Sequence, residues 1–399
     1  MKKFLALMLA LVMALALVAC GQQKEPDVQE PQGPTDTDEV TYKVAMITDY
    51  GDITDQSFNQ TTYEACKAFA EANGVDFQYF KPAGDNTADR VAMIESAIDQ
   101  GYNVIVMPGY AFGAAIAETA PKFEDVKFIA LDVSAVDLGE GFVVPANLYC
   151  AVYQEELCGY MAGYAAVKLG YKNLGFLGGM AVPAVQRYGY GFVQGVDAAA
   201  AELELTDVKL NYAYGNQFFG DADITAAMDT WYAGGTEVVF ACGGGIYTSA
   251  VDAAKKVEGA KVIGVDVDQA GVIANYAAGE GADAATVEGY KALTVTSAMK
   301  GLYPATYDTL TDVIVNGNWE KYSAKIDTLG LVSADDPAAN YVQIPMESTQ
   351  WADGAFTQDD YKALVKAMFD GTLTVSNDTT KAASDFATVI TVEDLGNIK

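Results

Sequence analysis

The segment from Asp49 to Gln60, which reads DYGDITDQSFNQ, carries the densest set of side chains that could do chemistry. Phe58 and Asn59 place an apolar ring beside an amide that can donate and accept hydrogen bonds, as recognition of a heteroaromatic base requires. The acids have a simpler interpretation, because Asp55 or Ser57 could cap a following helix. Three acids could also bind calcium and activate water, although the segment lacks EF-hand spacing and a terminal Glu. A helix cap does not account for Phe58 and Asn59, so a ligand site here stands as an equal alternative to the capping role.

Acidic residues and glycines follow other apolar runs along the sequence. Asp132 and Asp266 each come directly after such a run, and Gly243-Gly244-Gly245 follows another. The glycines lack the Lys-Ser/Thr pair of a phosphate-binding loop. Gly244 could therefore bring backbone N–H groups close to a ligand, or the three glycines could form a plain tight turn.

The composition limits the kinds of function that the chain can have. It contains 399 residues, with 24 Lys or Arg, 54 Asp or Glu and no His, which gives a formal net charge of −30. The absence of His excludes Ser-His-Asp and Cys-His nucleophile systems and removes the commonest zinc ligand. The negative charge argues against nucleic acid or anionic lipid as the main partner. What remains is an acidic globular protein with little apparatus for catalysis.

Short apolar runs alternate with amphipathic stretches through the body of the sequence. This alternation predicts βαβ units, and its two successive series predict an α/β protein with two doubly wound parallel-sheet lobes. Ligands bind at the carboxyl ends of strands in such sheets, so we expect a cleft between the lobes. The expected strands are 42–48, 75–80, 103–107 and 126–131, then 173–177, 208–214, 237–241 and 261–265. The expected helices are 57–73, 87–100 and 112–120, then 154–169, 188–201, 222–233 and 247–257.

The first forty residues have the pattern of a targeting signal. Lys2 and Lys3 precede an apolar run at 4–19, which has the length and flanks of a secretory signal peptide rather than a membrane span. The run ends in LVAC, which resembles the bacterial lipobox, so we expect cleavage before Cys20 and lipidation of its thiol. An ordinary signal peptide followed by a chance Cys is the alternative. Residues 21–40 are rich in proline and acids and are expected to form an extended tether.

Four further cysteines lie in the body of the chain, at Cys66, Cys150, Cys158 and Cys242. All four occur in apolar contexts, so we expect buried free thiols. Cys150 with Cys158 is the one plausible bridge.

Several motifs together resemble the basic membrane protein family. They are the lipobox and tether, the segment ending in SFNQ at 57–60, GFLGGM at 175–180 followed by Pro183, and GVDVDQ at 264–269. The best-understood branch of this family comprises purine nucleoside receptor lipoproteins of ABC importers. The resemblance covers roughly residues 42–330 and implies a type I periplasmic binding protein, with two lobes joined by three crossovers.

The resemblance also implies how a purine base would be held. Phe58 would stack on one face of the base and Asn59 would contact its edge, with Asp49 and Asp132 lining the base side. Phe219 would supply the second stacking ring from the other lobe, and its neighbour Phe218 is the alternative.

On the same basis, carboxylates and a lysine would hold the ribose. Asp266 would accept hydrogen bonds from the ribose hydroxyls. Lys300, in TSAMK at 296–300, would lie beside the ribose, with Lys291 as the fallback. The complete expected ligand-binding set is Asp49, Ser57, Phe58, Asn59, Asp132, Phe219, Gly244, Asp266 and Lys300.

The expected domains follow from these assignments. The signal peptide is 1–19, and the lipidated Cys20 with its tether is 20–40. The N-terminal lobe is 41–145 plus about 300–322, and the C-terminal lobe is 146–299 plus about 323–399. Residues 333–399 carry no family motif, and we expect only sheet-edge and helical packing there, for example at 359–369.

The combined expectation is a monomeric solute-binding lipoprotein, anchored outside the cytoplasm through Cys20. It would bind adenosine, guanosine or inosine and deliver it to an ABC permease, without catalysis, metal, cofactor or nucleic acid. One alternative is a receptor of the same fold for a sugar or a signalling molecule. A less favoured alternative is a nucleoside N-glycosidase that uses the Asp cluster as its base.

Overall fold

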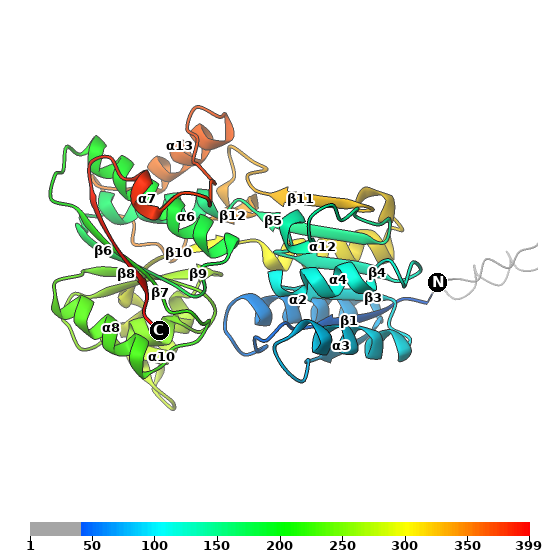
Figure 1. Cartoon of the computed structure of the whole chain (residues 1–399). Coiled ribbons are helices and arrows are strands. Elements are labelled where there is room, and N and C mark those ends of the chain that lie inside the picture. The colour runs from blue at the N-terminus through cyan, green and yellow to red at the C-terminus, as the bar shows by residue number, and fades with distance from the viewer. Residues whose placement is uncertain (1–40) are drawn as a thin grey trace, which may run out of the picture. The chain divides into compact units, whose positions relative to one another are not determined.

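The computed structural model describes residues 41–399 (Figure 1). The predicted signal peptide, the lipidation site at Cys20 and the tether lie outside the described residues. Within 41–399, every helix is too short or too polar to cross a membrane.

The first lobe is built on a six-stranded parallel sheet with the order β11-β5-β4-β3-β1-β2. Alternate residues of β1 enter two separate cores: Val44 and Met46 pack on one face, Ala45 and Ile47 on the other. This period of two arises because successive side chains of a strand point to opposite faces. The strands are β1 (Lys43–Ile47), β2 (Asp76–Phe80), β3 (Val104–Pro108), β4 (Lys127–Leu131), β5 (Leu148–Tyr153) and β11 (Lys325–Leu329).

Helices cover both faces of this sheet. Residues of α2 belong to one core, and residues of α3 and α4 belong to the other. The helices are α2 (Phe58–Asn73), α3 (Thr87–Asp99), η1 (Tyr110–Phe112), α4 (Gly113–Thr119), α5 (Ala135–Leu138), α12 (Leu302–Leu310), η3 (Thr311–Val315) and η4 (Trp319–Lys321).

The second lobe is built on a seven-stranded sheet with the order β12-β10-β9-β8-β6-β7-β13, in which β12 alone is antiparallel to its neighbour. The strands are β6 (Asn173–Gly178), β7 (Lys209–Tyr214), β8 (Val238–Cys242), β9 (Lys261–Asp266), β10 (Thr294–Lys300), β12 (Val342–Gln343) and β13 (Thr391–Asn397). The helices are α6 (Glu155–Lys168), α7 (Pro183–Glu202), α8 (Ala222–Ala233), α9 (Tyr247–Ala254), α10 (Ala270–Ala278), α11 (Ala284–Tyr290), η2 (Lys291–Leu293), η5 (Pro337–Ala339), α13 (Gln358–Phe369) and η6 (Ala383–Phe386).

Helices α6 and α7 pack unusually closely because glycines line their contact. A Cβ atom at Gly191 would lie 2.1 Å from the Glu156 carbonyl oxygen, so a side chain there would force the helices apart. This contact holds the first turn of α6, with Glu155 and Glu156, against α7, which carries Arg187 and Tyr188.

The chain crosses between the sheets after β5, after β10 and after β11. Residues 146–153 and 323–329, expected in the second lobe, belong to the first, because hydrogen bonding places β5 and β11 side by side in its sheet. The chain therefore passes from one lobe to the other at the carboxyl ends of three strands, at residues 153, 300 and 329. The same ends carry the polar residues of interest, so the crossovers lie next to the site.

Residues beyond 330 pack mainly on the second lobe. The helix expected near 359–369 is α13, while β12 and β13 form the two edges of the second sheet, as Figure 1 shows for β13 beside β7. Cys66, Cys150, Cys158 and Cys242 are buried free thiols, as the sequence indicated, and Cys150 and Cys158 are not bridged within the described residues.

Candidate functional site

A cavity of about 510 Å³ lies where the carboxyl ends of the strands of both sheets meet. Its walls come from the segment after β1, the first turns of α2 and α7, and the loops after β4, β7, β8 and β9. Of the expected ligand-binding set, the lining includes Asp49, Phe58, Asn59, Asp132, Phe219, Gly244, Asp266 and Lys300. Ser57 is not part of the lining, and its buried side chain contacts Asp266 instead.

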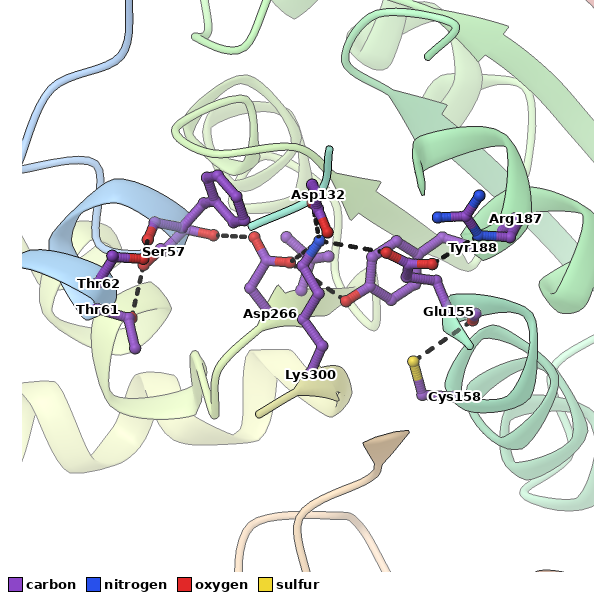
Figure 2. Close-up of polar contacts among 12 residues, drawn as sticks. Ser57, Thr61, Thr62, Asp132, Glu155, Cys158, Arg187, Tyr188, Asp266 and Lys300 are labelled. Carbon is purple, nitrogen blue, oxygen red and sulfur yellow. Dashed lines mark hydrogen bonds and ion pairs between the residues drawn. The ribbon is translucent and has the colours of Figure 1, made fainter. Parts of the chain in front are cut away.

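One end of the cavity, which we call the charged end, is formed by Lys300, Asp132, Glu155 and Asp266 (Figure 2). The side chain of Lys300 is only 3% exposed, and its Nζ lies 2.5 Å from Asp132 Oδ2, 3.4 Å from Glu155 Oε1 and 3.8 Å from Asp266 Oδ1. Arg187 Nε donates to Glu155 Oε2 at 2.7 Å. The acids come from both lobes, so these ion pairs join the lobes at the crossovers.

Burial and mutual charge set the protonation of this end. Burial raises the pKa of Asp132 to about 6, although the charge of Lys300 opposes the shift. Burial alone would lower the pKa of Lys300, but the carboxylates of Asp132, Glu155 and Asp266 outweigh it and hold that pKa above its ordinary value. Lys300 therefore keeps its positive charge. One lysine faces three carboxyl groups, those of Asp132, Glu155 and Asp266, so it does not neutralise all of them.

The backbone at both acidic strand exits is unusual. Asp132 has φ of 57° and Asp266 has φ of 63°, the left-handed region that non-glycine residues seldom occupy. Such conformations persist where the surrounding structure holds them, and they cluster at ligand sites. Here they turn the two carboxylates back toward Lys300.

The two lobes also contact each other directly beside Asp266. Ser57 Oγ donates to Asp266 Oδ2 at 2.6 Å, and Gln269 Nε2 donates to the Gln56 carbonyl oxygen at 3.2 Å. Tyr188 donates to Asp266 Oδ1 at 3.2 Å. The side-chain cap of the α2 start comes from Asp55, whose oxygens accept from the backbone N–H groups of residues 57, 59 and 60. The carboxylate of Asp55 therefore caps α2, whereas the hydroxyl of Ser57 binds the carboxylate of Asp266.

Another part of the cavity lining, which we call the aromatic end, is formed by Tyr50, Phe58, Tyr110 and Phe218. Tyr50 and Phe218 come from different lobes and stack with ring centroids 6.1 Å apart and planes 23° apart. The Tyr50 hydroxyl lies 3.3 Å from that of Tyr110. Phe58 also contacts the charged end, because Lys300 Nζ lies 4.8 Å from its ring centroid. The cavity therefore offers ring faces at one end and charge at the other.

The structure separates the two candidate phenylalanines of the second lobe. Phe218 is partly buried and stacks on Tyr50, whereas Phe219 is 61% exposed and pairs through its backbone with Gly245. Both line the cavity, but Phe218 is the ring opposite the first lobe. The sequence analysis expected Phe219 as the second stacking ring, with Phe218 as the alternative.

Asp49 and Asn59 lie side by side on the first-lobe wall. Asp49 Oδ1 accepts from the backbone N–H groups of Tyr50 and Gly51, and burial raises its pKa to about 6. Asn59 Nδ2 donates to Asp55 Oδ2 at 3.0 Å, which fixes the amide. Among the described residues, Asn59 Oδ1 and Asp132 Oδ1 are buried oxygens with no hydrogen-bond partner. Both atoms are acceptors on residues that line the cavity, so a ligand that donates hydrogen bonds would supply the partners that they lack.

Glycine makes this wall possible. A Cβ at Gly109, which has φ of 123°, would lie 2.5 Å from Asp49 Oδ2. A Cβ at Gly51 would lie 2.1 Å from Asn59 Nδ2. Larger residues at these positions would displace Asp49 and Asn59 from the cavity.

Sequence reasoning missed Glu155, Arg187 and Tyr188, which support the charged end. A signal was present, since the two glutamates 155 and 156 begin a helix that is otherwise almost entirely apolar. Lys291, the fallback for Lys300, forms an exposed ion pair with Glu288 on the surface instead.

The arrangement of two lobes around a cavity agrees with comparisons to known proteins. A family model described as ABC transporter substrate-binding protein PnrA-like matches residues 42–341. The chain belongs to this PnrA-like family. Its members are substrate-binding proteins of ABC transporters rather than enzymes, and such proteins of ABC importers work outside the cytoplasm.

Relatives and solved structures support the same assignment. The chain is 28% identical over 281 residues to the ABC transporter nucleoside-binding protein BmpA of Lactococcus lactis subsp. cremoris, which covers 67% of this chain and 75% of the relative. It is 26% identical over 297 residues to basic membrane protein B of Borreliella burgdorferi, covering 72% and 78%. An ABC solute-binding protein structure from Aeropyrum pernix K1 superimposes with a TM-score of 0.63 at 20% identity, covering 86% of this chain and 90% of that one. The type I periplasmic binding protein fold predicted from the sequence is thereby confirmed.

Proposed function

We propose that this PnrA-like protein binds a purine nucleoside in the cavity between its lobes and delivers it to an ABC permease. The observation that carries the proposal is the division of one cavity into an aromatic end and a charged end with unpaired acceptor oxygens. A nucleoside has the matching division, because a flat heteroaromatic base is joined to a sugar rich in hydroxyl donors.

The aromatic end supports the placement of the base. Phe58 offers a ring face on the first-lobe side, and Phe218 offers one on the second-lobe side. We infer that the bound base lies between these rings and displaces the contact that Tyr50 now makes with Phe218. The free Oδ1 of Asn59 and the carboxylate of Asp49 would then accept hydrogen bonds from N–H groups on the base edge.

The charged end supports the placement of the ribose. Ionised carboxylates only accept hydrogen bonds, so the 2′ and 3′ hydroxyls would donate to Asp132 Oδ1 and Asp266. Lys300 would donate to a hydroxyl oxygen from the opposite side. A nucleotide is a poor ligand for the same cavity, because its phosphate would meet Asp49, Asp132 and Asp266.

Delivery requires that the ligand favours the closed arrangement of the lobes. We take the structure as the closed form, because its lobes are already joined by the contacts of Ser57 with Asp266 and of Lys300 with Asp132. A nucleoside that touches both walls adds contacts available only in this form, so binding shifts the population towards it.

We further propose that the protein is a monomer held at the membrane by lipid on Cys20. Replacing Cys20 by Ser should release it from the membrane fraction, whereas retention there would contradict the lipid anchor.

Calorimetry with ligand-free protein tests the ligand assignment. We expect 1:1 binding of guanosine, inosine or adenosine, with cytidine and ribose much weaker and the corresponding monophosphates excluded. Binding of ribose without any nucleoside would contradict the proposal and favour a sugar receptor. In a parallel incubation with inosine, catalytic release of hypoxanthine would contradict the receptor and favour an N-glycosidase.

A further inference from the structure

The last segment of the sequence lies outside the family match and still reaches the cavity wall. The family model ends at residue 341, whereas β13 (Thr391–Asn397) forms the edge of the second sheet beside β7 (Figure 1). Ile398 continues this pairing, with its N–H donating to the Tyr214 carbonyl oxygen at 2.8 Å. The pairing brings Lys399 beside residues 215–221, which we call the aromatic loop because it carries Phe218 and Phe219.

Lys399 closes a chain of side-chain contacts across the aromatic loop. Its Nζ donates to Gln217 Oε1 at 3.0 Å and forms an ion pair with Asp221. Gln217 Nε2 in turn donates to the Phe219 carbonyl oxygen and to Asp221 Oδ2, both at 2.9 Å. Asp221 Oδ1 accepts from the backbone N–H groups of Asp223 and Ile224 in the first turn of α8, so the loop is attached to both this helix and the end of β13.

Phe218 is held by its packing on the core and on Tyr50 and by the backbone of the aromatic loop. Its ring lies over Gly179 and Gly243, where Cβ atoms would approach it to 2.4 Å and 2.8 Å. Glycines leave room for the ring but offer no side chain to hold it. The position of the ring therefore follows the backbone of the aromatic loop, which begins in the left-handed conformation at Asn216, with φ of 56°.

We propose that β13 and Lys399 form a strap that positions Phe218 against the ligand, with Lys399 as a positioning residue for the aromatic end. The ligand part of this inference rests on the proposed nucleoside function. The strap acts through Gln217 and Asp221, so loss of Lys399 should loosen the aromatic loop while leaving the charged end intact.

Substitution of Lys399 tests the strap against a matched control. Lys399→Met should weaken guanosine binding by about two- to five-fold, mainly through faster dissociation, as expected for loss of a partly exposed ion pair with a hydrogen bond. Lys366→Met removes an ion pair with Asp370 on α13, in the same final segment and away from the cavity, and should leave Kd unchanged. Lys399→Arg should restore most of the affinity.

A double-mutant cycle separates positioning from general destabilisation. In a Phe218→Ala background, Lys399→Met should have no further effect on Kd, because the ring that it positions is absent. An equal loss in both backgrounds, or an unchanged Kd with a lowered Tm, would overturn the proposal.

Hydrogen exchange tests the strap without any ligand. Lys399→Met should speed exchange at the amides of Asn216 and Gly245, which are bonded to Gly179 and Phe218 respectively. If wild-type protein binds no nucleoside but Lys399→Met still speeds exchange, the proposed nucleoside function is contradicted and the proposed strap is supported. If nucleoside binds and exchange is unchanged, the strap has failed and the function stands.

Discussion

The two ends of the cavity are built on different principles. The charged end consists of buried groups at the carboxyl ends of regular strands or at the start of α6, and they are already paired with one another. The aromatic end consists of partly buried rings, of which Tyr50 and Phe218 lie on irregular segments supported by glycines, while Phe58 begins α2 and Tyr110 begins η1. We therefore expect the side chains of the charged end to keep their positions on ligand binding, and the rings of the aromatic end to move to fit the ligand.

This difference has an energetic consequence. A charge cluster in a protein interior is costly to break, because removing one member leaves the others buried without compensation. An aromatic contact is smaller and largely independent of its neighbours, so its loss costs roughly the area and stacking of one ring. Mutations at the charged end should thus alter folding and binding together, whereas those at the aromatic end should alter binding alone.

The largest effect is expected for Lys300→Met. This change leaves Asp132 and Asp266 without their cation and Glu155 with Arg187 alone, so the free energy of unfolding should fall by about 3–5 kcal/mol and nucleoside binding should be lost. Lys321→Met is the control, since it removes an exposed ion pair with Asp312 and should cost no more than about 1 kcal/mol. Chemical denaturation measures both. Equal stability of the two variants would mean that the charged end is not the rigid element described above.

Phe58→Ala should weaken nucleoside binding by about 1–3 kcal/mol through lost ring area and stacking. Phe369→Ala, at an exposed ring at the end of α13, serves as the control and should leave affinity unchanged. Calorimetry provides the comparison, and an unaltered Kd for the Phe58 variant would remove that ring from the ligand contact.

The pH dependence should separate the acids from the rings. Ligand hydroxyls and N–H groups favour ionised Asp49 and Asp132, whose pKa values are both near 6, so binding should release protons. Affinity should fall as the pH is lowered from 7.5 to 5, approaching about tenfold per group. Titration in two buffers of different ionisation enthalpy measures the released protons. Proton uptake on binding, or an affinity independent of pH, would contradict this role.

The same pKa shifts act on stability in the opposite sense. An acid whose pKa is raised on folding binds its proton more tightly in the folded state. Asp49 and Asp132 therefore raise the free energy of unfolding as the pH falls through about 6 towards their ordinary value of 3.8. Weaker binding at low pH then cannot be ascribed to unfolding caused by these two acids.

The smallest expected effect distinguishes two neighbouring rings. Phe218→Leu should cost about 0.5–1.5 kcal/mol of binding, because it removes an aromatic contact while keeping apolar volume. Phe219→Leu, at a mostly exposed ring, should change binding by less than about 0.5 kcal/mol. The reverse order would restore the assignment of Phe219 made from the sequence.

Much of the fold followed from the pattern of apolar runs, and the exceptions have physical causes. The expected strands at 103–107, 126–131 and 237–241 are buried parallel strands, which read as continuous apolar runs. Strand β10 was missed because its buried residues include Thr296 and Ser297, whose hydroxyls are paired with Thr349 and with the Gln269 N–H. Strand β5 was missed because only the four-residue α5, rather than a full-length helix, occupies the connection before it.

The site was partly predictable for a similar reason. Asp49, Asp132 and Asp266 could be brought together from sequence, because the carboxyl ends of parallel strands meet at one edge. Glu155 and Arg187 could not, because their burial depends on the packing of α6 against α7. Nor could any periodicity distinguish Phe218 from Phe219 in an irregular loop, where backbone geometry alone decides which ring turns inward.

A crystal structure of the protein with guanosine tests the central claim most directly. We predict that the base lies between Phe58 and Phe218, and that the ribose hydroxyls contact Asp132, Asp266 and Lys300. A nucleoside bound in the reverse orientation, with its base at the charged end, or bound outside this cavity, would contradict the account.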